Sequence, residues 1–220
     1  RRARVMEAIG DGVAVLQGAA EYPAYVKFRQ NNQFFYLTGI EVPRAILVID
    51  GRTKQSTAYL PPRNERSERS EGPVLTPGDE AITLTGIERV LDRAAFAEEL
   101  AALNEQGRTL YLPHRAEALG AATPHAVADH AEASLEDPWD GRQSREAAFI
   151  GRVRAKAPGV TVKNLDPVLD AMRLIKSPRE IALIRESTRI AGVGIMEAMR
   201  AARPGQYEYE LEAIGDYIFK

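Results

Sequence analysis

The chain has 220 residues and an ordinary globular composition, with 45% hydrophobic and 27% charged residues, enough for one large domain or one domain and part of another. Its net charge of −2 excludes the basic stripe that would indicate nucleic acid or a membrane surface as partner. The absence of cysteine excludes disulfides, thiolate zinc sites and cysteine nucleophiles. No apolar run approaches the roughly 18 residues of a membrane span, and the first residues lack the apolar core of a signal peptide. We therefore expect a cytoplasmic protein.

The first sixty residues predict the start of an α/β body. Apolar residues at helical spacing indicate a short helix over residues 1–10. Short apolar runs at 13–16 and 45–49 indicate strands, the second of them covered on both faces. After the Asp50-Gly51 turn, residues 56–60 are expected to return as a hairpin partner.

Two stretches in this half carry many aromatic or charged side chains. The aromatic cluster at 34–39 lies beside a turn and is interpreted as core and loop. Between Arg63 and Glu71, basic and acidic residues alternate, which is typical of a solvated surface turn or helix. We expect the aromatic cluster to serve packing. The charges between Arg63 and Glu71 cancel locally, and we expect that stretch to face solvent.

Strands continue to alternate with helices further along the chain. Residues 81–84 resemble another strand, and 93–105 has the single apolar face of an amphipathic helix. A strand is expected at 109–112. The alanine-rich stretch 114–142 is poorly periodic and predicts helix and loop with modest packing, and 159–164 is a last strand or extended connector. The sequence has no internal repeats.

A helix–break–helix joint follows. Asp166 could cap a helix that runs through Leu174. Ser177 is a favoured N-cap residue, Pro178 suits the first position of a helix, and Glu180 completes a capping box. These signals predict a joint between two bodies.

The helix that begins at Pro178 has apolar residues on two faces, which predicts packing on both sides. One face carries Ile181, Ile184, Thr188, Ala191, Ile195 and Met199, and the other Leu183, Ile190 and Ala201. Gly192 and Gly194 each cost about 1 kcal/mol inside a helix, which a close neighbouring backbone would make tolerable. Pro204-Gly205 ends this helix, and another is expected from Tyr207 to Phe219.

Four stretches together resemble a known family. Two lie in the first half, FRQNNQFFYLTGIEVPRAILVI and YLPPRNERSERSEGP, and two lie near the end, MRLIKSPREIALIRESTRIA and MRAARPGQYEYELEA. In this order they resemble the Xaa-Pro aminopeptidases (aminopeptidase P) and prolidases, the creatinase-like pita-bread metallopeptidases. The resemblance implies an α/β fold: an N-terminal creatinase-like domain over residues 1–162, with a mixed β-sheet flanked by helices. Residues 163–220 would be the linker helix and the opening helices of a pita-bread α+β catalytic domain.

This sequence departs from the family at two places. Relatives often carry an aromatic residue just before the glycine that matches Gly72, close to the substrate cleft, where this chain has Ser70 and Glu71. Relatives also often have Thr where Tyr207 stands, so the N-cap of the last helix is expected to be weaker here.

The resemblance implies a parent enzyme that hydrolyses the bond between an N-terminal residue and a following proline. The family holds two divalent cations, commonly manganese, with two Asp, one His and two Glu, and the metals activate a bridging water. Those ligands lie downstream of the helix expected from Tyr207, so no residue here matches a metal or catalytic position. We therefore expect the 220 residues alone to bind no metal and to be inactive. The implied partners are peptides with proline in second position and further copies of the chain, with no nucleic acid and no membrane.

No other catalytic motif stands out. The histidines are His114, His125 and His130. The last two are five residues apart, which turns them about 140° from each other on a helix, whereas metal pairs on helices want a spacing of four. With Asp129 and Glu132 nearby, a metal site remains a weaker interpretation than surface histidines. There is no G-x-S-x-G elbow, P-loop or G-x-G-x-x-G. Five carboxylates near the end have the spacing of caps and solvent faces: Asp166, Asp170, Glu180, Glu186 and Glu197.

Two alternatives stay open. A prolidase takes only dipeptides, and nothing in these residues separates it from an aminopeptidase. Some pita-bread relatives have lost the metal ligands and act as binding modules, although the near-neutral charge does not favour histone or DNA binding. Residues after Lys220 would decide, since the five ligands are either there or not.

Overall fold

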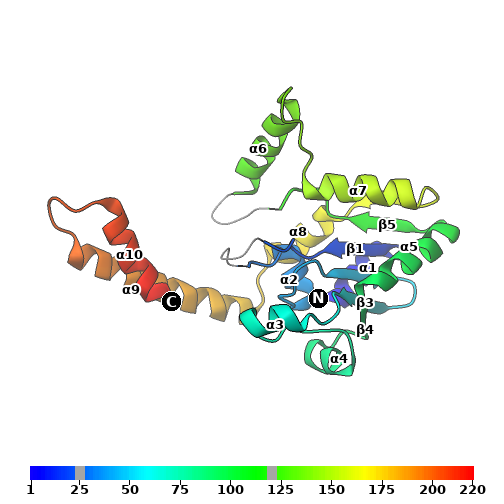
Figure 1. Ribbon diagram of the computed structural model, residues 1–220, viewed down its shortest axis with the longest axis horizontal. Coiled ribbons are helices and arrows are strands. Elements are labelled where there is room, and N and C mark those ends of the chain that lie inside the picture. Colours follow the sequence, from blue (N-terminus) through cyan, green and yellow to red (C-terminus); the bar gives the residue numbers. More distant parts are fainter. Residues whose placement is uncertain (23–27, 118–122) are drawn as a thin grey trace. The chain divides into compact units, whose positions relative to one another are not determined.

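The computed structural model describes residues 1–22, 28–117 and 123–220, and it divides into two compact units, residues 1–170 and 171–220 (Figure 1). Residues 118–122 of the stretch predicted as helix and loop lie outside the described residues. The side chains of Ser70 and Glu71, where relatives carry an aromatic residue, also lie outside them.

The first unit is built on a six-stranded sheet of order β4-β3-β2-β1-β5-β6. The strands are β1 Val13–Gln17, β2 Ile46–Asp50, β3 Gln55–Leu60, β4 Arg89–Asp92, β5 Thr109–Leu112 and β6 Thr161–Asn164. Strand β2 pairs antiparallel with β1 and β3, and the other neighbours pair parallel. All strands except β2 therefore run in one direction, and their carboxyl ends share one edge of the sheet.

Helices surround this sheet. They are α1 Arg2–Ile9, α2 Asn32–Thr38, α3 Glu65–Glu71, α4 Asp79–Thr85, the 3-10 helix η1 Arg93–Ala95, α5 Phe96–Glu105, α6 Pro124–Glu136, α7 Arg145–Lys156 and α8 Asp166–Leu174. Alternate strand residues face opposite sides. Val13 and Val15 belong to a core cluster with apolar side chains of α5 and α7, while α1 packs against β1 and β2. The central strands are consequently covered on both faces.

Most of the predicted elements of the first unit are confirmed. The helix over 1–10 is α1, the strand at 13–16 is β1, and 45–49 pairs with 56–60 as the β2–β3 hairpin. The later strands at 109–112 and 159–164 are β5 and β6, and the helix over 93–105 begins with one 3-10 turn. In the alanine-rich stretch, none of the described side chains of α6 is buried, as modest packing predicts.

Two predictions about the elements of the first unit are wrong. Residues 81–84 are not a strand but part of α4, which begins with two acidic residues and ends at Gly86 in the left-handed conformation (φ 62°). The stretch 34–39 contains core residues, but helix α2 replaces the expected loop. The Asn31 side chain caps α2 by accepting hydrogen bonds from two amides of its first turn, and Gly39 (φ 70°) ends it. Both helices are short, and the residues that indicate a helix lie at their ends and not in an apolar pattern.

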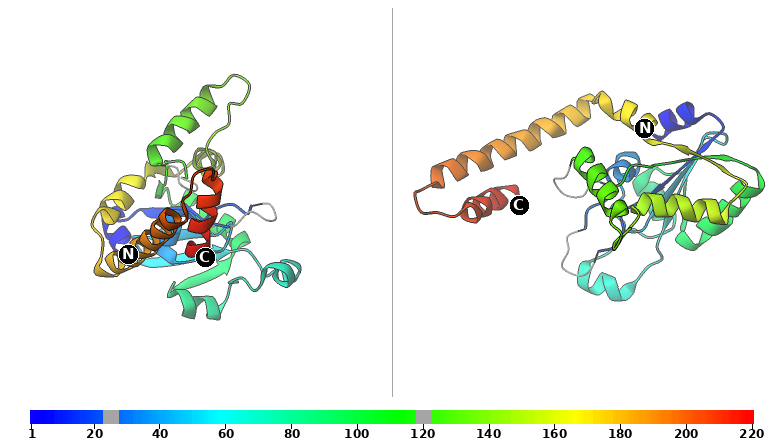
Figure 2. Two further views of the ribbon diagram at one scale, coloured as in Figure 1. Left: turned by 90° about the vertical axis from the view of Figure 1, so that its left-hand side faces the viewer. Right: turned by 90° about the horizontal axis from the view of Figure 1, so that it is seen from above.

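The second unit is a helical hairpin of α9 Pro178–Ala201 and α10 Glu208–Phe219 (Figure 2). The predicted capping box is confirmed: the Ser177 hydroxyl accepts from the Glu180 amide at 3.3 Å, and the Glu180 carboxylate accepts from the Ser177 amide at 2.9 Å. At Tyr207, where we expected a weaker cap, the backbone amide donates to the Glu210 carboxylate at 2.7 Å, and the Glu210 amide donates to the Tyr207 carbonyl oxygen at 3.1 Å.

Helix α10 covers one face of α9 around Gly194. A Cβ at Gly194 would lie 3.0 Å from the Phe219 ring, whereas one at Gly192 would meet nothing within 4 Å. The neighbour that lies close to Gly194 is therefore an aromatic side chain and not the backbone that we expected. Packing on both sides is not seen in the described chain, since six large apolar side chains of α9 stay exposed: Ile181, Leu183, Ile184, Ile195, Met196 and Met199.

Candidate functional site

The carboxyl edge of the sheet gathers the loops that could form a site. In open sheets with parallel strands, ligands bind outside the carboxyl ends of the strands. Strands β1, β5 and β6 end side by side here, so the segments 18–22, 113–117 and 165–166 leave the sheet together. We call this region the carboxyl edge.

A buried glutamine fixes the segment that leaves β1. The Gln30 side chain is 4% exposed, and its Oε1 accepts from the amides of Ala19 at 2.6 Å and Asn31 at 2.9 Å. Its Nε2 donates to the carbonyl oxygens of Ile40 and Val42, both at 3.0 Å. One side chain thus ties together three backbone segments between β1 and β2. Sequence reasoning missed this residue, and its only signal was its place in a stretch that resembles the family.

A half-buried group of charges lies beside this segment. The Arg145 guanidinium, at the start of α7, donates to the Gly18 carbonyl oxygen at 2.5 Å and lies 3.8 Å from a carboxylate oxygen of Glu117. Burial raises the pKa of Glu117, and the Glu146 carboxylate raises it further, against the opposing effect of Arg145. Burial also raises the pKa of Glu146 and of Tyr22. This is the strongest concentration of perturbed groups at the carboxyl edge, and such groups gather at functional sites.

The carboxylates predicted as caps have other partners here. Asp166 does not cap α8: one carboxylate oxygen accepts from the amides of His114 at 3.0 Å and Arg115 at 2.8 Å. The Arg115 guanidinium in turn binds both oxygens of Asp170, at 3.1 and 2.5 Å. These bonds attach the segment after β5 to α8. In the second unit, Glu186 and Glu197 pair with arginines on exposed faces, as predicted for solvent-facing residues.

The histidines do not come together as a metal site in the described chain. His114 follows β5, and its amide rather than its ring makes the contact with Asp166. His125 and His130 lie on α6, both exposed, and the His125 ring pairs with Asp129 at 3.4 Å. Across residues 1–22, 28–117 and 123–220, no three His, Asp or Glu side chains are grouped so that they could hold a metal ion.

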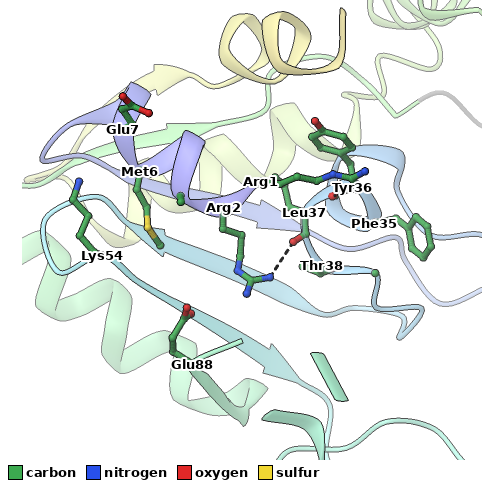
Figure 3. Close-up of a pocket in the computed structure, with 12 residues that line it drawn as sticks. Arg1, Arg2, Met6, Glu7, Phe35, Tyr36, Leu37, Thr38, Lys54 and Glu88 are labelled. Carbon is green, nitrogen blue, oxygen red and sulfur yellow. Dashed lines mark hydrogen bonds between the residues drawn. The ribbon is translucent and has the colours of Figure 1, made fainter. Parts of the chain in front are cut away.

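A second candidate is a surface depression of about 1040 Å³ between α1 and the end of α2, which we call the α1–α2 hollow (Figure 3). The Arg2 guanidinium donates to the carbonyl oxygens of Leu37 at 3.3 Å and Gly86 at 2.5 Å. Arg1 donates to the Tyr36 carbonyl oxygen at 2.8 Å and lies 4.1 Å from the centre of its ring. The cations thus meet the carboxyl ends of α2 and α4, where the helix dipole is negative.

The hollow also presents apolar groups and a third cation. Met6, Phe35 and Lys54 line it together with the two arginines and two carboxylates, Glu7 and Glu88, so charges of both signs are present. The two arginines already bind backbone carbonyl oxygens, and the Glu88 carboxylate accepts a hydrogen bond from the Ser56 amide at 3.0 Å. Because its charges are of both signs, the hollow points neither to an anionic ligand nor to a particular reaction.

Comparison with known proteins agrees with the fold. Residues 1–111, half of the chain, match the family model described as "Aminopeptidase P, N-terminal domain". The Xaa-Pro aminopeptidase of Escherichia coli is 30% identical over 96% of this chain and 46% of its own length. A solved structure described as an aminopeptidase P of Bacillus anthracis superposes with a TM-score of 0.77 at 25% identity, over 99% of this chain and 49% of its own. A zinc-substituted E. coli aminopeptidase P in complex with product gives a TM-score of 0.68 at 24% identity, over 99% and 48%.

The first unit is therefore an α/β domain of the kind that precedes a pita-bread catalytic domain, and the helices after it match the start of that catalytic domain. The chain belongs to the aminopeptidase P family. It spans about half the length of the relatives it matches. None of the helices in the described part of the chain has both the length and the hydropathy that a membrane crossing requires.

Proposed function

We propose that the chain is the N-terminal portion of a metal-dependent Xaa-Pro aminopeptidase, which releases an N-terminal residue from peptides with proline in second position. The observation that carries this proposal is the match to the E. coli Xaa-Pro aminopeptidase, which covers 96% of the chain and therefore includes both units. Residues 1–162 would form the N-terminal domain, and residues 163–220 the linker helix and the first catalytic-domain helices. The enzyme would be cytoplasmic.

The parent enzyme would use two divalent cations, commonly manganese in the family, and the zinc-substituted relative supports a divalent metal. We place that centre outside these 220 residues. The three histidines of this chain are exposed, and the described His, Asp and Glu residues offer no group of three that could hold an ion. No catalytic step is therefore assigned to these 220 residues. Their role would be to shape the approach to the cleft and to build the oligomer.

The carboxyl edge is the part of this chain best suited to face the cleft. Its segments are fixed from within, by Gln30 after β1 and by Asp166 after β5. Rigid supports of this kind hold loops in place for binding. The charges of Glu117 and Arg145 lie at the same edge.

Peptidase assays test the proposal. The 220-residue chain, incubated with manganese and a peptide whose second residue is proline, should release no N-terminal residue, whereas the full-length gene product should. Cleavage by the 220-residue chain that a chelator removes and manganese restores would contradict the placement of the metal centre. An inactive full-length product would favour a binding module. Activity on dipeptides but not on longer peptides would indicate a prolidase.

A further inference from the structure

The segment that follows β5 is attached to α8 at two points, and we call residues 113–117 the exit segment. One carboxylate oxygen of Asp166 accepts from the amides of His114 at 3.0 Å and Arg115 at 2.8 Å. One helical turn later, the Arg115 guanidinium binds both oxygens of Asp170, at 3.1 and 2.5 Å. Residues four apart lie on one face of a helix, so the exit segment is held along a single face of α8.

The start of α8 is a firm support for these contacts. Asp166 is 4% exposed, and its amide donates to the Asn164 side-chain oxygen at 2.9 Å. Leu165 and Leu169 are completely buried, and the Leu165 amide donates to the Leu112 carbonyl oxygen at 2.9 Å, next to the paired ends of β5 and β6. The Asp166 carboxylate is therefore fixed by the core of the first unit.

The other end of the exit segment carries Glu117 into the charged group at the carboxyl edge. The Glu117 amide donates to the Glu146 carboxylate in the first turn of α7. The Glu117 carboxylate accepts from the side chain of Asn31, the N-cap residue of α2, and lies 3.8 Å from the Arg145 guanidinium. The exit segment thus connects α8 to the amino ends of two other helices.

The contact between Arg115 and Asp170 differs from the contact at Asp166 because both side chains are exposed, by 40% and 47%. Exposed ion pairs contribute little to stability, but a guanidinium that binds both carboxylate oxygens fixes direction as well as distance. Loss of this contact should leave the fold intact and allow the exit segment to shift around Asp166. Arg115 is therefore suited to set the position of Glu117 and not to hold the domain together.

We propose that Arg115 is a positioning residue of the parent enzyme, which holds the exit segment so that Glu117 meets the bound peptide at the carboxyl edge. A carboxylate accepts up to about four hydrogen bonds, so Glu117 accepts from an N–H group of the peptide as well as from Asn31. This inference rests on the proposed function, because the proposed function brings the carboxyl edge to the cleft. Arg115 then acts on peptide binding and not on the reacting bond.

Kinetics of the full-length gene product test this role. Arg115→Ala should raise the KM for a peptide with proline in second position about threefold to tenfold and leave kcat within about twofold, because a contact used equally in binding and reaction is weakened. Arg142→Ala is the matched control. It removes another bidentate contact, with Asp140 in the turn of the 95% exposed Trp139, and should leave both constants unchanged.

A second variant separates positioning from stability. Asp170→Ala removes the other half of the same contact, so it should raise KM as much as Arg115→Ala, and the double variant should raise it no further. Arg115→Lys keeps the charge but cannot bind both oxygens in a fork, so it should recover only part of the loss. A role in stability alone would lower the melting temperature of these variants and leave KM at the wild-type value, which would contradict the proposal.

Hydrogen exchange on the same full-length protein follows the exit segment itself. The amides of residues 114, 115 and 117 should exchange about tenfold faster in Arg115→Ala than in wild type, whereas those of β5 should not change. Unchanged exchange would overturn this inference, and so would an active enzyme whose KM Arg115→Ala does not alter; neither result touches the proposed function. A wild-type product without peptidase activity would overturn the proposed function and this role together.

Discussion

A buried ion pair between Asp50 and Arg108 joins the β2–β3 turn to the start of β5. The Arg108 side chain is 4% exposed. Its guanidinium donates to the two carboxylate oxygens of Asp50 at 2.8 and 3.2 Å and to the Asp11 carbonyl oxygen at 2.6 Å, while its Nε has no partner among the described residues. Asp50→Asn removes the only negative charge in these contacts. The variant should therefore leave a buried cation without compensation.

The expected loss is large. Removing one partner of a buried ion pair costs about 3–5 kcal/mol, and we expect the lower end because an asparagine oxygen still accepts one hydrogen bond. Domains are stable by only about 5–15 kcal/mol in total. At about 2–4 °C per kcal/mol for a domain of this size, the melting temperature of the first unit should fall by about 6–12 °C.

Urea unfolding followed by far-UV circular dichroism measures this change, because the exposed Trp139 is a poor reporter of the core. Asp140→Asn is the matched control. It makes the same change in an ion pair whose arginine is exposed, so the midpoint should not move measurably. Adding Arg108→Met to Asp50→Asn should restore part of the stability, because the unpaired charge is then gone. Equal midpoints for wild type and Asp50→Asn would refute the reasoning.

The pair also makes stability depend on pH. Burial alone would raise the pKa of Asp50, but the hydrogen bonds from Arg108 and from the amides of Arg52 and Thr53 outweigh it, so the pKa is lowered in the folded state. The unfolded chain then binds the proton more tightly than the folded one. The contribution of the pair is therefore present above the unfolded-state pKa and is lost as the pH falls below about 4. Asp50→Asn should flatten that part of the stability curve.

Three further predictions concern the supports of the two units. Gly192→Ala should stabilise α9 by about 0.5–1 kcal/mol, while Gly194→Ala should gain less because its methyl group meets an aromatic ring; a larger gain at Gly194 in thermal melts would contradict this packing. Gln30→Ala leaves several buried backbone groups without partners, at about 1–3 kcal/mol each, so urea unfolding should begin at a clearly lower concentration than in wild type. Ser177→Ala should cost about 1 kcal/mol of α9 stability, seen as faster amide exchange in its first turn.

The sequence predicts the fold well where an apolar pattern is long or where a strand is covered on both faces of the sheet. The apolar run at 45–49 and the segment after its turn predict two adjacent strands. In the structure they are the paired strands β2 and β3. The run at 81–84 is only four residues long, too short for apolar content to separate strand from helix. Acidic residues in the first turn of α4 and the left-handed Gly86 at its end favour a helix. Strand β4 was missed because only Val90 of its four residues is buried.

The candidate site was less accessible to sequence reasoning. Gln30 contacts segments up to twelve residues away in the chain, and Arg145 reaches Gly18 across 127 residues, so neither role has a local signature. The exposure of Trp139 contradicts the usual preference of tryptophan for the interior, and a pattern of residue types cannot reveal it. By contrast, the capping box at Ser177 is a contact within one turn, and its two hydrogen bonds were predicted from four consecutive residues.

The two outer strands of the sheet restrict how copies of this chain can meet. Strands β4 and β6 are each four residues long, and charged side chains stand on them at Arg89, Asp92 and Lys163. Short, charged outer strands discourage the addition of a strand from another molecule, because a growing ladder would have little backbone to pair with and would bury those charges. Extension of the sheet from copy to copy is therefore disfavoured. Contacts between copies, where they form, are therefore expected to be made by side chains and not by the backbone ladder of the sheet.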